Sequence, residues 1–393
     1  MDIEGKKMKK ITIIYDFLKE LGGLERVMFF QANKLKNHAD IELLFSYISE
    51  KDKAKIIKEL ELDNSIEPKQ IGKTRNETLQ LALSFLFPSR TRKIKTDLII
   101  SHSFMASRMA YNKKKKDGTP YIVILYHPPN FLYSNVEGWA NTSARIFAKF
   151  LGYFFKDKLK KIDIECVRGA NIVIAISEYT AKRVKEIYGL NPAIVYPHIS
   201  GFFKSMKKSE KEHFLKSNNI KRKFLFAHGR IIPDKNYKIL LDFIKEIKNI
   251  DLIISGSVEE NYRKELNEKI KELGLENRAR ILGRISKDDL LGYYNSAELF
   301  LMPAKKEDFG LTIVESIACG CPVIAWNDNA GPNEIINSEN GLLAKPYNLS
   351  DFIFKIKTGL NKKWDKNKVV KSVNKFKEDE ISKRLIDVIR KYV

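Results

Sequence analysis

The sequence predicts an α/β protein built from two doubly wound domains. Short apolar runs of strand length alternate with segments of helix length along both halves, which is the pattern of parallel sheets covered by helices on both faces. The alternation stops once, across residues 196–223, which are rich in lysine and include Pro197 and Gly201. At 393 residues and 44% hydrophobic content, the chain is too long for one ordinary core and long enough for two.

In the first half, a strand is predicted at Ile11–Tyr15, followed by Gly22-Gly23 and a helix through Glu25–Leu35. The next apolar runs have the length of buried strands, and each is followed by turn or helix signals. They are Ile41–Ser46, Leu98–Ser101, Tyr121–Tyr126 and Ile172–Ile176. We therefore expect residues 1–200 to form an N-terminal Rossmann-like domain.

The second half restarts the alternation of strands and helices. Its predicted strands are Phe224–Ala227, Asp251–Ser255, Arg280–Leu282, Leu299–Met302 and Pro322–Ala325. Its predicted helices are Tyr237–Lys248, Tyr262–Leu273, Lys287–Ser296 and Leu311–Ala318. The pattern predicts a second Rossmann-like domain over residues 201–377. A last amphipathic helix, within residues 378–393, is expected to pack back on the first domain.

The charge balance is strongly basic. Lysine and arginine number 71 and aspartate and glutamate 49, which gives a net charge of +22. Such an excess favours polyanionic partners, namely nucleic acid, anionic lipid headgroups or phosphorylated ligands. A lysine-biased proteome, or the lysine and glutamate enrichment of thermophiles, produces the same excess on solvated helix faces. Both explanations stay open at this point.

The cysteines and the apolar segments bear on the compartment. Cys166, Cys319 and Cys321 lack C-x-x-C spacing and predict neither a disulfide framework nor a zinc site, which favours a reducing compartment. No run reaches about 18 uncharged apolar residues, so no transmembrane helix is expected. The N-terminal segment lacks the long apolar core and cleavage site of a signal peptide. We therefore expect a cytoplasmic protein.

The strongest functional signal is a pair of glutamates with E-x7-E spacing. Glu307 lies in a predicted loop, and Glu315 lies just over one turn into the helix Leu311–Ala318. Between them, the free amides and the dipole of the helix N-terminus suit a phosphate or a developing anion. A carboxylate can clamp a vicinal diol such as ribose. These residues indicate a site for a phosphorylated, hydroxyl-rich ligand, with an acidic first helical turn as the alternative.

Four weaker elements accompany this pair. Arg230 and Lys235 follow the predicted strand Phe224–Ala227 and suit a diphosphate, although two ordinary basic residues would look the same. The string Gly283-Arg284-Ile285 is either a loop that reads a base edge or an ordinary βα turn. Gly23 has the location of a phosphate-binding turn without the full G-x-G-x-x-G spacing. His127 follows a strand end, where a lone histidine is more often structural than catalytic.

In this order, the elements resemble the GT4 family of glycosyltransferases, whose GT-B fold has two Rossmann-like doubly wound domains facing a central cleft. The resemblance covers nearly the whole chain and is most specific from Phe224 to Pro346. Its motifs are G-R-x-x-x-x-K at 229–235, L-G-R at 282–284, E-x7-E at 307–315, A-C-G-C-P-V-I-A at 318–325, the Asn333-Glu334 turn and N-G-L-L at 340–343.

The resemblance implies a role for each matching residue. Arg230 and Lys235 would hold the donor diphosphate, Glu315 the ribose hydroxyls and Glu307 the donor sugar. The backbone amides of Phe309, Gly310, Leu311 and Thr312 would bind the sugar hydroxyls and the phosphate. The base would lie against Gly283, Arg284 and Ile285. Gly23 would approach the phosphate or the acceptor, and His127 would lie beside the transferred sugar. The resemblance also implies retention of anomeric configuration, an acceptor on the N-terminal domain, and no bound metal or cofactor besides the nucleotide diphosphate-sugar co-substrate.

One stretch resembles the mannosyltransferase branch of the family. Residues 126–133, together with Gly22–Val27 and Ala175–Tyr188, are similar to a region that often carries a C-H-T-P-P-R-Y-L-like string. In this chain Tyr126 replaces the cysteine, and Asn130 stands where arginine would. The resemblance to this branch favours GDP-mannose as the donor, with a glycan or lipid-linked acceptor.

Basic and aromatic segments predict contact with a membrane surface. They are Ala144–Lys161, Leu79–Lys95 and a basic loop at Lys113–Lys116. Helices of this composition can lie on an anionic bilayer, which would make the enzyme peripheral on the cytoplasmic face. A core-facing helix with a solvated basic back is the alternative.

Other classes of function fit the sequence less well. A basic protein that binds nucleic acid or another anion without transferase activity is the main rival. The chain has no zinc spacing, RNP-like aromatic string or helix-turn-helix signal, so no nucleic-acid partner is expected. Neither half has the G-x-G-x-x-G of a dehydrogenase. A catalytically silent scaffold would lack a reason to keep both glutamates and the Arg–Lys pair. A nucleoside diphosphate titration separates these rivals.

Overall fold

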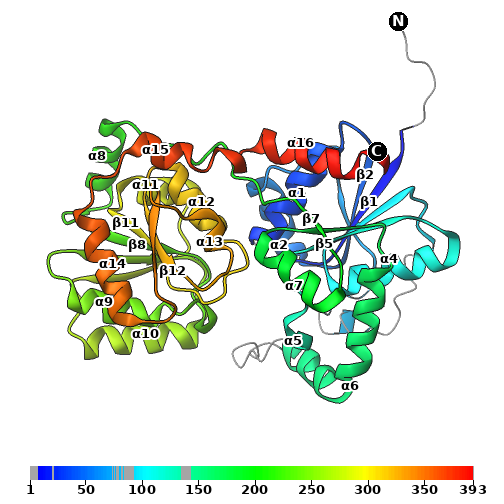
Figure 1. Cartoon of the computed structure of the whole chain (residues 1–393), viewed down its shortest axis with the longest axis horizontal. Coiled ribbons are helices and arrows are strands. Elements are labelled where there is room, and N and C mark those ends of the chain that lie inside the picture. The colour runs from blue at the N-terminus through cyan, green and yellow to red at the C-terminus, as the bar shows by residue number, and fades with distance from the viewer. Residues whose placement is uncertain are drawn as a thin grey trace, which may run out of the picture. The chain divides into compact units, whose positions relative to one another are not determined.

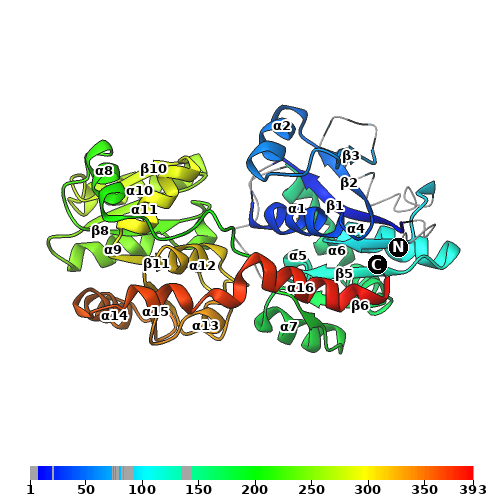
Figure 2. The same cartoon turned by 90° about the horizontal axis from the view of Figure 1, so that it is seen from above.

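The structure, a computed structural model, describes residues 8–19, 22–72, 74, 76, 79–80, 83, 93–133 and 143–392. The chain divides into two compact units, Met1–Pro197 with Ile381–Val393 and His198–Glu380. Within the described residues, each unit contains one parallel sheet with helices packed against it (Figures 1 and 2). The predicted fold class, α/β with two doubly wound domains, is therefore confirmed.

The described part of the first unit holds a seven-stranded sheet with the order β3-β2-β1-β4-β5-β6-β7. Its strands are β1 (Lys10–Leu18), β2 (Asp40–Ile48), β3 (Pro68–Gln70), β4 (Leu98–Ser101), β5 (Tyr121–Leu125), β6 (Ile172–Ala175) and β7 (Ala193–Ile194). Its helices are α1 (Gly23–Leu35), α2 (Glu50–Glu59), α4 (Phe104–Asp117), α5 (Asn130–Tyr133), α6 (Ser143–Arg168) and α7 (Glu178–Tyr188). The strand order reverses between β1 and β4, which makes this the switch point of the sheet.

The second unit holds a six-stranded sheet with the order β10-β9-β8-β11-β12-β13. Its strands are β8 (Phe224–His228), β9 (Asp251–Ser255), β10 (Ala279–Gly283), β11 (Leu299–Met302), β12 (Val323–Trp326) and β13 (Gly341–Ala344). Its helices are α8 (Lys208–Ser217), α9 (Lys238–Glu246), α10 (Glu260–Glu272), α11 (Lys287–Ser296), α12 (Leu311–Ala318), α13 (Pro332–Ile335), α14 (Leu349–Asn361) and α15 (Lys366–Lys371). Single 3-10 turns lie at η2 (Pro233–Lys235) and η3 (Asn374–Phe376).

The apolar strands are buried because helices cover both faces of the second sheet. Helices α9, α10 and α14 pack together on one side, and α11, α12, α13 and α15 are in contact with one another on the other side (Figure 1). All residues of β11 and β12 are buried. On the α9 side, Phe243 stacks on Phe352 with ring centroids 4.6 Å apart. The near-continuous apolar strands thus fold as the sequence predicts for a covered parallel sheet.

The helix α16 (Glu378–Ile389) carries its buried residues on one stripe. Ile381, Leu385 and Ile389 recur every four residues and are at most 5% exposed. Arg384 Nε donates a hydrogen bond to the carbonyl of Ile194 at 3.2 Å. The helix therefore lies beside β7 of the first unit.

The predicted basic loop at Lys113–Lys116 is wrong, because these residues form the end of α4. Gly118 ends this helix in the left-handed conformation with φ of 79°, as a C-cap glycine does. Lysines in a last turn also interact favourably with the helix dipole, so the charge run stabilises a helix here. Much of the predicted membrane segment Leu79–Lys95, and the side chains of residues 143–154, lie outside the described residues.

Candidate active site

The candidate site lies at the carboxyl edge of the second sheet, where the strand order reverses. β9 and β10 follow β8 on one side, and β11, β12 and β13 lie on the other, so the switch point lies between β8 and β11. Ligands of doubly wound sheets bind outside the carboxyl ends of the strands at such a point. The loop after β8 carries Arg230 and Lys235, and the loop after β11 carries Glu307. The structure therefore places predicted site residues on both sides of the switch point.

Lys235 and Glu307 are in direct contact. Lys235 Nζ lies 2.5 Å from Glu307 Oε2, and 25% and 17% of the two side chains are exposed. Asn236, directly after Lys235, has φ of 57° and donates its amide to the carbonyl of Pro303 at 3.4 Å, which ties the turn to the end of β11. An ammonium has three N–H donors, so Lys235 can bind a carboxylate and a phosphate oxygen together.

The hydroxyl of Tyr237 lies within reach of the charges of both Glu307 and Arg230. Burial raises the pKa of the Tyr237 phenol, the charge of Glu307 raises it further, and the guanidinium of Arg230 lowers it. Both charged groups therefore lie close enough to one hydroxyl to act on it. A Cβ atom on Gly229 would lie only 2.8 Å from that hydroxyl, so a glycine lets the loop pass over the ring. The structure thus gathers two cations and one carboxylate at the switch point.

The loop that carries Glu307 is held by its neighbours. The amide of Gly331 donates to the carbonyl of Glu307 at 2.8 Å, and a Cβ atom on Gly331 would lie 2.4 Å from Phe309 Cα. Phe309 is 3% exposed and meets the ring of Phe376 edge-on at 5.4 Å. Because backbone and side chain are both fixed, the position of the Glu307 carboxylate depends little on loop motion.

The helix α12 begins directly after Gly310, between the loop of Glu307 and Glu315. Gly310 is the N-cap residue with φ of 99°, a conformation that favours glycine. Leu311 and Thr312 follow in the first turn and are half-buried. The first amides of a helix have no acceptor within the helix, and they carry the positive end of its dipole. This turn is therefore suited to a phosphate or a hydroxyl oxygen.

Glu315 is buried one turn further along α12. Only 4% of the residue is exposed, and its Oε2 accepts a hydrogen bond from the Tyr294 hydroxyl at 3.0 Å. Tyr294 lies on α11, and its ring meets His228 edge-on at 6.2 Å. His228 is the last residue of β8, directly before Gly229. These contacts place Glu315 beside the end of β8.

Glycines end three adjacent strands at the same edge. Gly229, Gly256 and Gly283 follow or end β8, β9 and β10, with φ values of 150°, 137° and 73°. The amide of Gly256 donates to the carbonyl of Gly283 at 2.8 Å, and a Cβ atom on Gly256 would lie 1.7 Å from the oxygen of Gly229. Only bare backbone fits there. Arg284, which is exposed, and Ile285, which is half-buried, follow at the outer side of this row.

The other two predicted site residues belong to the first unit. Gly23 is exposed and begins α1 directly after its N-cap Gly22. His127 is half-buried after β5, and its Nδ1 lies 3.0 Å from the carbonyl of Pro128. A carbonyl only accepts, so we assign the proton to Nδ1, which leaves Nε2 as an acceptor. Both residues follow carboxyl ends of strands in their own sheet.

Sequence reasoning missed two residues at these edges. His102 directly follows β4 at the first switch point, is 3% exposed, and contacts the Tyr126 hydroxyl through Nδ1 at 3.0 Å. A histidine directly after a buried strand was a usable signal. Tyr294 carried no such signal, because its partner Glu315 is 21 residues away in the sequence.

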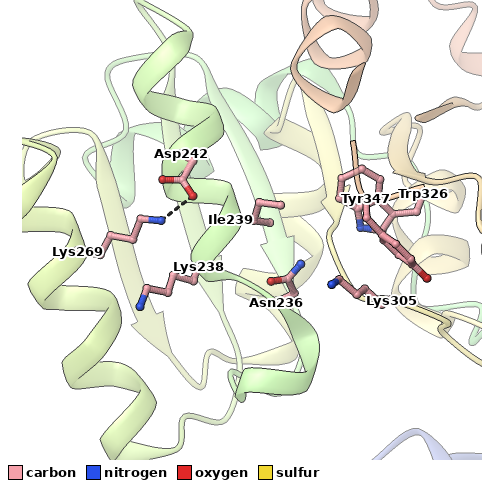
Figure 3. Close-up of a pocket in the computed structure, with 8 residues that line it drawn as sticks. All are labelled: Asn236, Lys238, Ile239, Asp242, Lys269, Lys305, Trp326 and Tyr347. Atoms are coloured by element: carbon pink, nitrogen blue, oxygen red, sulfur yellow. Dashed lines mark hydrogen bonds and ion pairs between the residues drawn. The ribbon is translucent and has the colours of Figure 1, made fainter. Parts of the chain in front are cut away.

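A cavity of about 290 Å³ lies next to the site loops. Its lining includes Asn236, which follows Lys235, and Lys305, which precedes Glu307 by two residues. Figure 3 shows Tyr347 beside Trp326, with ring centroids 5.8 Å apart, and Lys305 Nζ lies 4.8 Å from the Tyr347 ring. None of the predicted site residues lines this cavity.

Among the described residues, no group of three or more His, Cys, Asp or Glu side chains could hold a metal ion. Within the same part of the chain, no helix combines the length and apolar character needed to cross a bilayer. The three cysteines are free thiols, and burial raises the pKa of Cys166 and Cys321 to about 12.

Two family models match the chain in succession, Glycosyltransferase Family 4 over residues 21–199 and Glycosyl transferases group 1 over residues 208–379. The chain belongs to the family 4 glycosyltransferases. This membership accounts for the order of motifs along both halves. The matches to the first curated relatives span only about half of those proteins' length.

Several curated relatives of this family 4 glycosyltransferase carry glycosyltransferase names. The mannosylfructose-phosphate synthase of Agrobacterium fabrum is 24% identical over 51% of this chain and 47% of its own. The 2-deoxystreptamine N-acetyl-D-glucosaminyltransferase of Niallia circulans is 32% identical over 37% of this chain and 38% of its own. An uncharacterized glycosyltransferase of Methanocaldococcus jannaschii is 26% identical over 66% of this chain and 64% of its own.

Solved structures show the same fold over nearly the full chain. Anabaena HepE in complex with UDP and glucose has a TM-score of 0.73 and 18% identity, and covers 98% of this chain and 100% of its own. Sucrose-phosphate synthase from Thermosynechococcus elongatus has a TM-score of 0.74 and 15% identity, with 98% of each chain covered. The GT-B fold of the family 4 glycosyltransferase is thereby established.

Proposed function

We propose that this family 4 glycosyltransferase moves a hexose from a nucleotide diphosphate-sugar to a glycan or lipid-linked acceptor, with retention of anomeric configuration. The observation that supports this most directly is the contact of Lys235 with Glu307 at the switch point of the second sheet, 2.5 Å apart, on the loop that also carries Arg230. Two cations and a fixed carboxylate fit the phosphate and sugar ends of such a donor.

The cations are assigned to the leaving group. Arg230 and Lys235 bind the diphosphate, and the amides of Phe309–Thr312 at the start of α12 add further donors. When the bond to the sugar breaks, negative charge grows on the diphosphate. Fixed donors aimed at that charge lower the barrier without reorganising during the reaction. The leaving phosphate in turn assists the acceptor hydroxyl on the same face of the sugar, as the family resemblance implies.

The carboxylates and glycine loops are assigned to recognition of the donor. Glu315 binds the ribose hydroxyls, and Glu307 contacts hydroxyls of the transferred sugar. The row of glycines ending at Gly283 lets a base lie against backbone, with Arg284 and Ile285 at its side. In the first unit, His127 is assigned to the transferred sugar and Gly23 to the phosphate or acceptor side.

The sequence and the relatives point to more than one donor sugar. The stretch after Tyr126 favours mannose, and one relative is named for a mannosyl product. HepE was crystallised with UDP-glucose, and another relative is an N-acetylglucosaminyltransferase. We therefore place GDP-mannose first and UDP-glucose second among the donors to test.

The test is a panel of nucleotide sugars scored by thermal stabilisation and by slow hydrolysis of the donor. We expect one base and one sugar to stabilise the protein and to be hydrolysed, and Arg230→Ala to weaken both effects. Lys238→Ala is a matched control, because Lys238 lies close by on α9 with 49% of its side chain exposed and pairs weakly with Glu265 at 4.0 Å. If no nucleoside diphosphate binds the wild type, the proposal is wrong.

We further propose that the acceptor is reached at an anionic membrane surface. In the described end of α6, Phe155 is 48% exposed, and Lys158 and Lys161 on the same helix are also exposed. Each lysine near an anionic surface adds about 1 kcal/mol of attraction. Flotation with anionic liposomes should recover the protein at low salt and lose it at high salt. If neutral liposomes recover as much protein as anionic ones, or if anionic liposomes recover none at either salt concentration, the proposed membrane contact is wrong.

A further inference from the structure

The carboxylate of Glu315 is held by a residue that none of the sequence motifs includes. Tyr294 donates its hydroxyl to Glu315 Oε2 at 3.0 Å, and the two residues are 0% and 4% exposed. A hydrogen bond to a charged acceptor is about twice as strong as one between neutral groups, and more so where water is excluded. The hydroxyl therefore fixes the direction of one carboxylate oxygen.

The ring of Tyr294 is itself immobile. It meets Phe226 and Phe300 edge-on at 5.5 Å each, and Phe203 at 5.8 Å. Contacts from three sides leave the ring no other rotamer without moving the core. Because the ring cannot follow the carboxylate, the carboxylate must keep the orientation that the hydroxyl sets.

A fixed carboxylate matters for binding a diol. Two vicinal hydroxyls need two oxygens at the right spacing, and a free glutamate would lose side-chain entropy when it adopts that arrangement. A carboxylate has about four lone-pair sites, and the hydrogen bond from Tyr294 occupies only one of them. We propose that Tyr294 is a positioning residue that orients Glu315 toward the ribose diol of the donor, without touching the donor itself. This inference rests on the proposed role of Glu315.

The competing interpretation is that Tyr294 only fills the core. Tyr294→Phe separates the two, because it keeps the ring and removes one oxygen. Tyr293→Phe is the matched control: this neighbour is 4% exposed, meets the ring of Phe214 edge-on at 5.0 Å and stacks on Phe226 at 5.2 Å. A loss that comes from weakened packing alone would affect both variants.

The experiment measures the affinity of four proteins for two probes by calorimetry. The proteins are the wild type, Tyr294→Phe, Tyr293→Phe and Glu315→Ala. The probes are GDP and 2′,3′-dideoxyguanosine diphosphate, with the UDP pair run in parallel. We expect Tyr294→Phe to weaken binding of GDP or UDP about tenfold and to leave the dideoxy probe within about twofold of wild type. We expect Tyr293→Phe to bind both probes like wild type.

The outcomes distinguish this inference from the function on which it rests. If Glu315→Ala leaves the preference for the ribose probe unchanged, the ribose assignment fails and the inference falls with it. If Glu315→Ala removes that preference and Tyr294→Phe keeps it, the assignment stands and the positioning role is overturned. An equal loss for both probes in Tyr294→Phe also overturns it, because it shows damage to the core. Melting temperatures of all variants identify that case independently.

Discussion

The two sheets share a doubly wound topology but differ in the charge that they place at the switch point. In the second unit, Lys235 and Glu307 face each other there as a partly exposed ion pair. In the first unit, Asp16 and His102 lie near the corresponding edge and are 8% and 3% exposed. Burial raises the pKa of Asp16 to about 7 and lowers that of His102 to about 3. The edge of the second sheet therefore carries partly exposed charged side chains, whereas burial at the edge of the first sheet disfavours the charged forms of Asp16 and His102.

The comparison separates what the fold supplies from what the sequence supplies. The topology supplies a crevice at the ends of the strands in both units. The side chains decide what that crevice can bind: displayed cations favour a diphosphate, whereas buried and largely neutral groups favour an uncharged, hydroxyl-bearing ligand. The proposed assignment of the donor to the second unit and of the acceptor to the first therefore has an electrostatic counterpart within each unit.

The largest expected effect comes from removing the cation at the second edge. Lys235→Ala should lower the rate of sugar transfer by about 100- to 1000-fold, the cost of losing one fixed donor to a developing anion. The measurement is kcat with the best donor of the panel. Lys238→Ala, which removes an equal charge nearby, should stay within about twofold of wild type. Similar losses of kcat in both variants would mean that the effect comes from the overall surface charge and not from the position of Lys235.

The next effect compares one glycine from each unit. Gly256→Ala should cost about 3 kcal/mol of stability, because φ is 137° and the new Cβ would lie 1.7 Å from the oxygen of Gly229. Gly118→Ala in the first unit should cost only about 1 kcal/mol, because φ is 79° but nothing lies within 4 Å. Hydrogen exchange reports the two units separately. Equal losses of stability in the two variants would show that the backbone around Gly256 can move to accept a Cβ atom.

A third prediction concerns pH and the first edge. Asp16 is buried, and its pKa rises from 3.8 unfolded to about 7 folded. Between these values the folded chain holds a proton that the unfolded chain has lost, so this group makes stability fall as pH rises from about 4 to 7. The slope is at most about 1.4 kcal/mol per pH unit. Asp16→Asn should remove it.

Denaturant unfolding at pH 4.5 and pH 7.5 tests this prediction. His102 has the opposite slope, because its lowered pKa makes stability rise with pH between about 3 and 6.5. The relevant quantity is therefore the difference between Asp16→Asn and wild type at each pH, in which the His102 contribution cancels. A difference that is the same at both pH values contradicts the raised pKa of Asp16.

The sequence predicted most strands of both sheets and the charged residues at the edge of the second sheet. It did not predict the short strand β13 or the end of α4, and each miss has a physical reason. Apolar runs predicted strands such as Leu299–Met302 at their observed bounds, and strand ends pointed to Arg230, Lys235 and Glu307. The short strand β13 was missed, because Gly341–Ala344 holds only two large apolar residues, whereas the equally short Leu299–Met302 is apolar throughout. The helical residues Lys113–Lys116 were predicted as a loop, because four consecutive lysines show no apolar periodicity in the sequence.

Contacts between residues distant in the sequence were the main gap. The bond from Tyr294 to Glu315 and the contact of His102 with Tyr126 join residues 21 and 24 positions apart. Local pattern and spacing carry no record of such pairs, since they depend on how helices pack across a sheet. The residues that touch a ligand are thus easier to find than those that orient them.

The smallest expected effect compares two ion pairs, one from each unit. Lys113–Asp117 and Lys269–Asp242 are both 2.6 Å long, but the lysine side chain is 5% exposed in the first and 16% in the second. Asp117→Asn leaves a buried ammonium without its counter-charge, so we expect a loss of about 1–2 kcal/mol, against about 0.5 kcal/mol for Asp242→Asn. Hydrogen bonds from Lys113 and Thr119 lower the pKa of Asp117 to about 2. Its contribution is therefore complete above pH 4 and lost as pH falls toward 2. If the two variants lose equal stability at pH 7, the burial of the lysine does not set the strength of the pair.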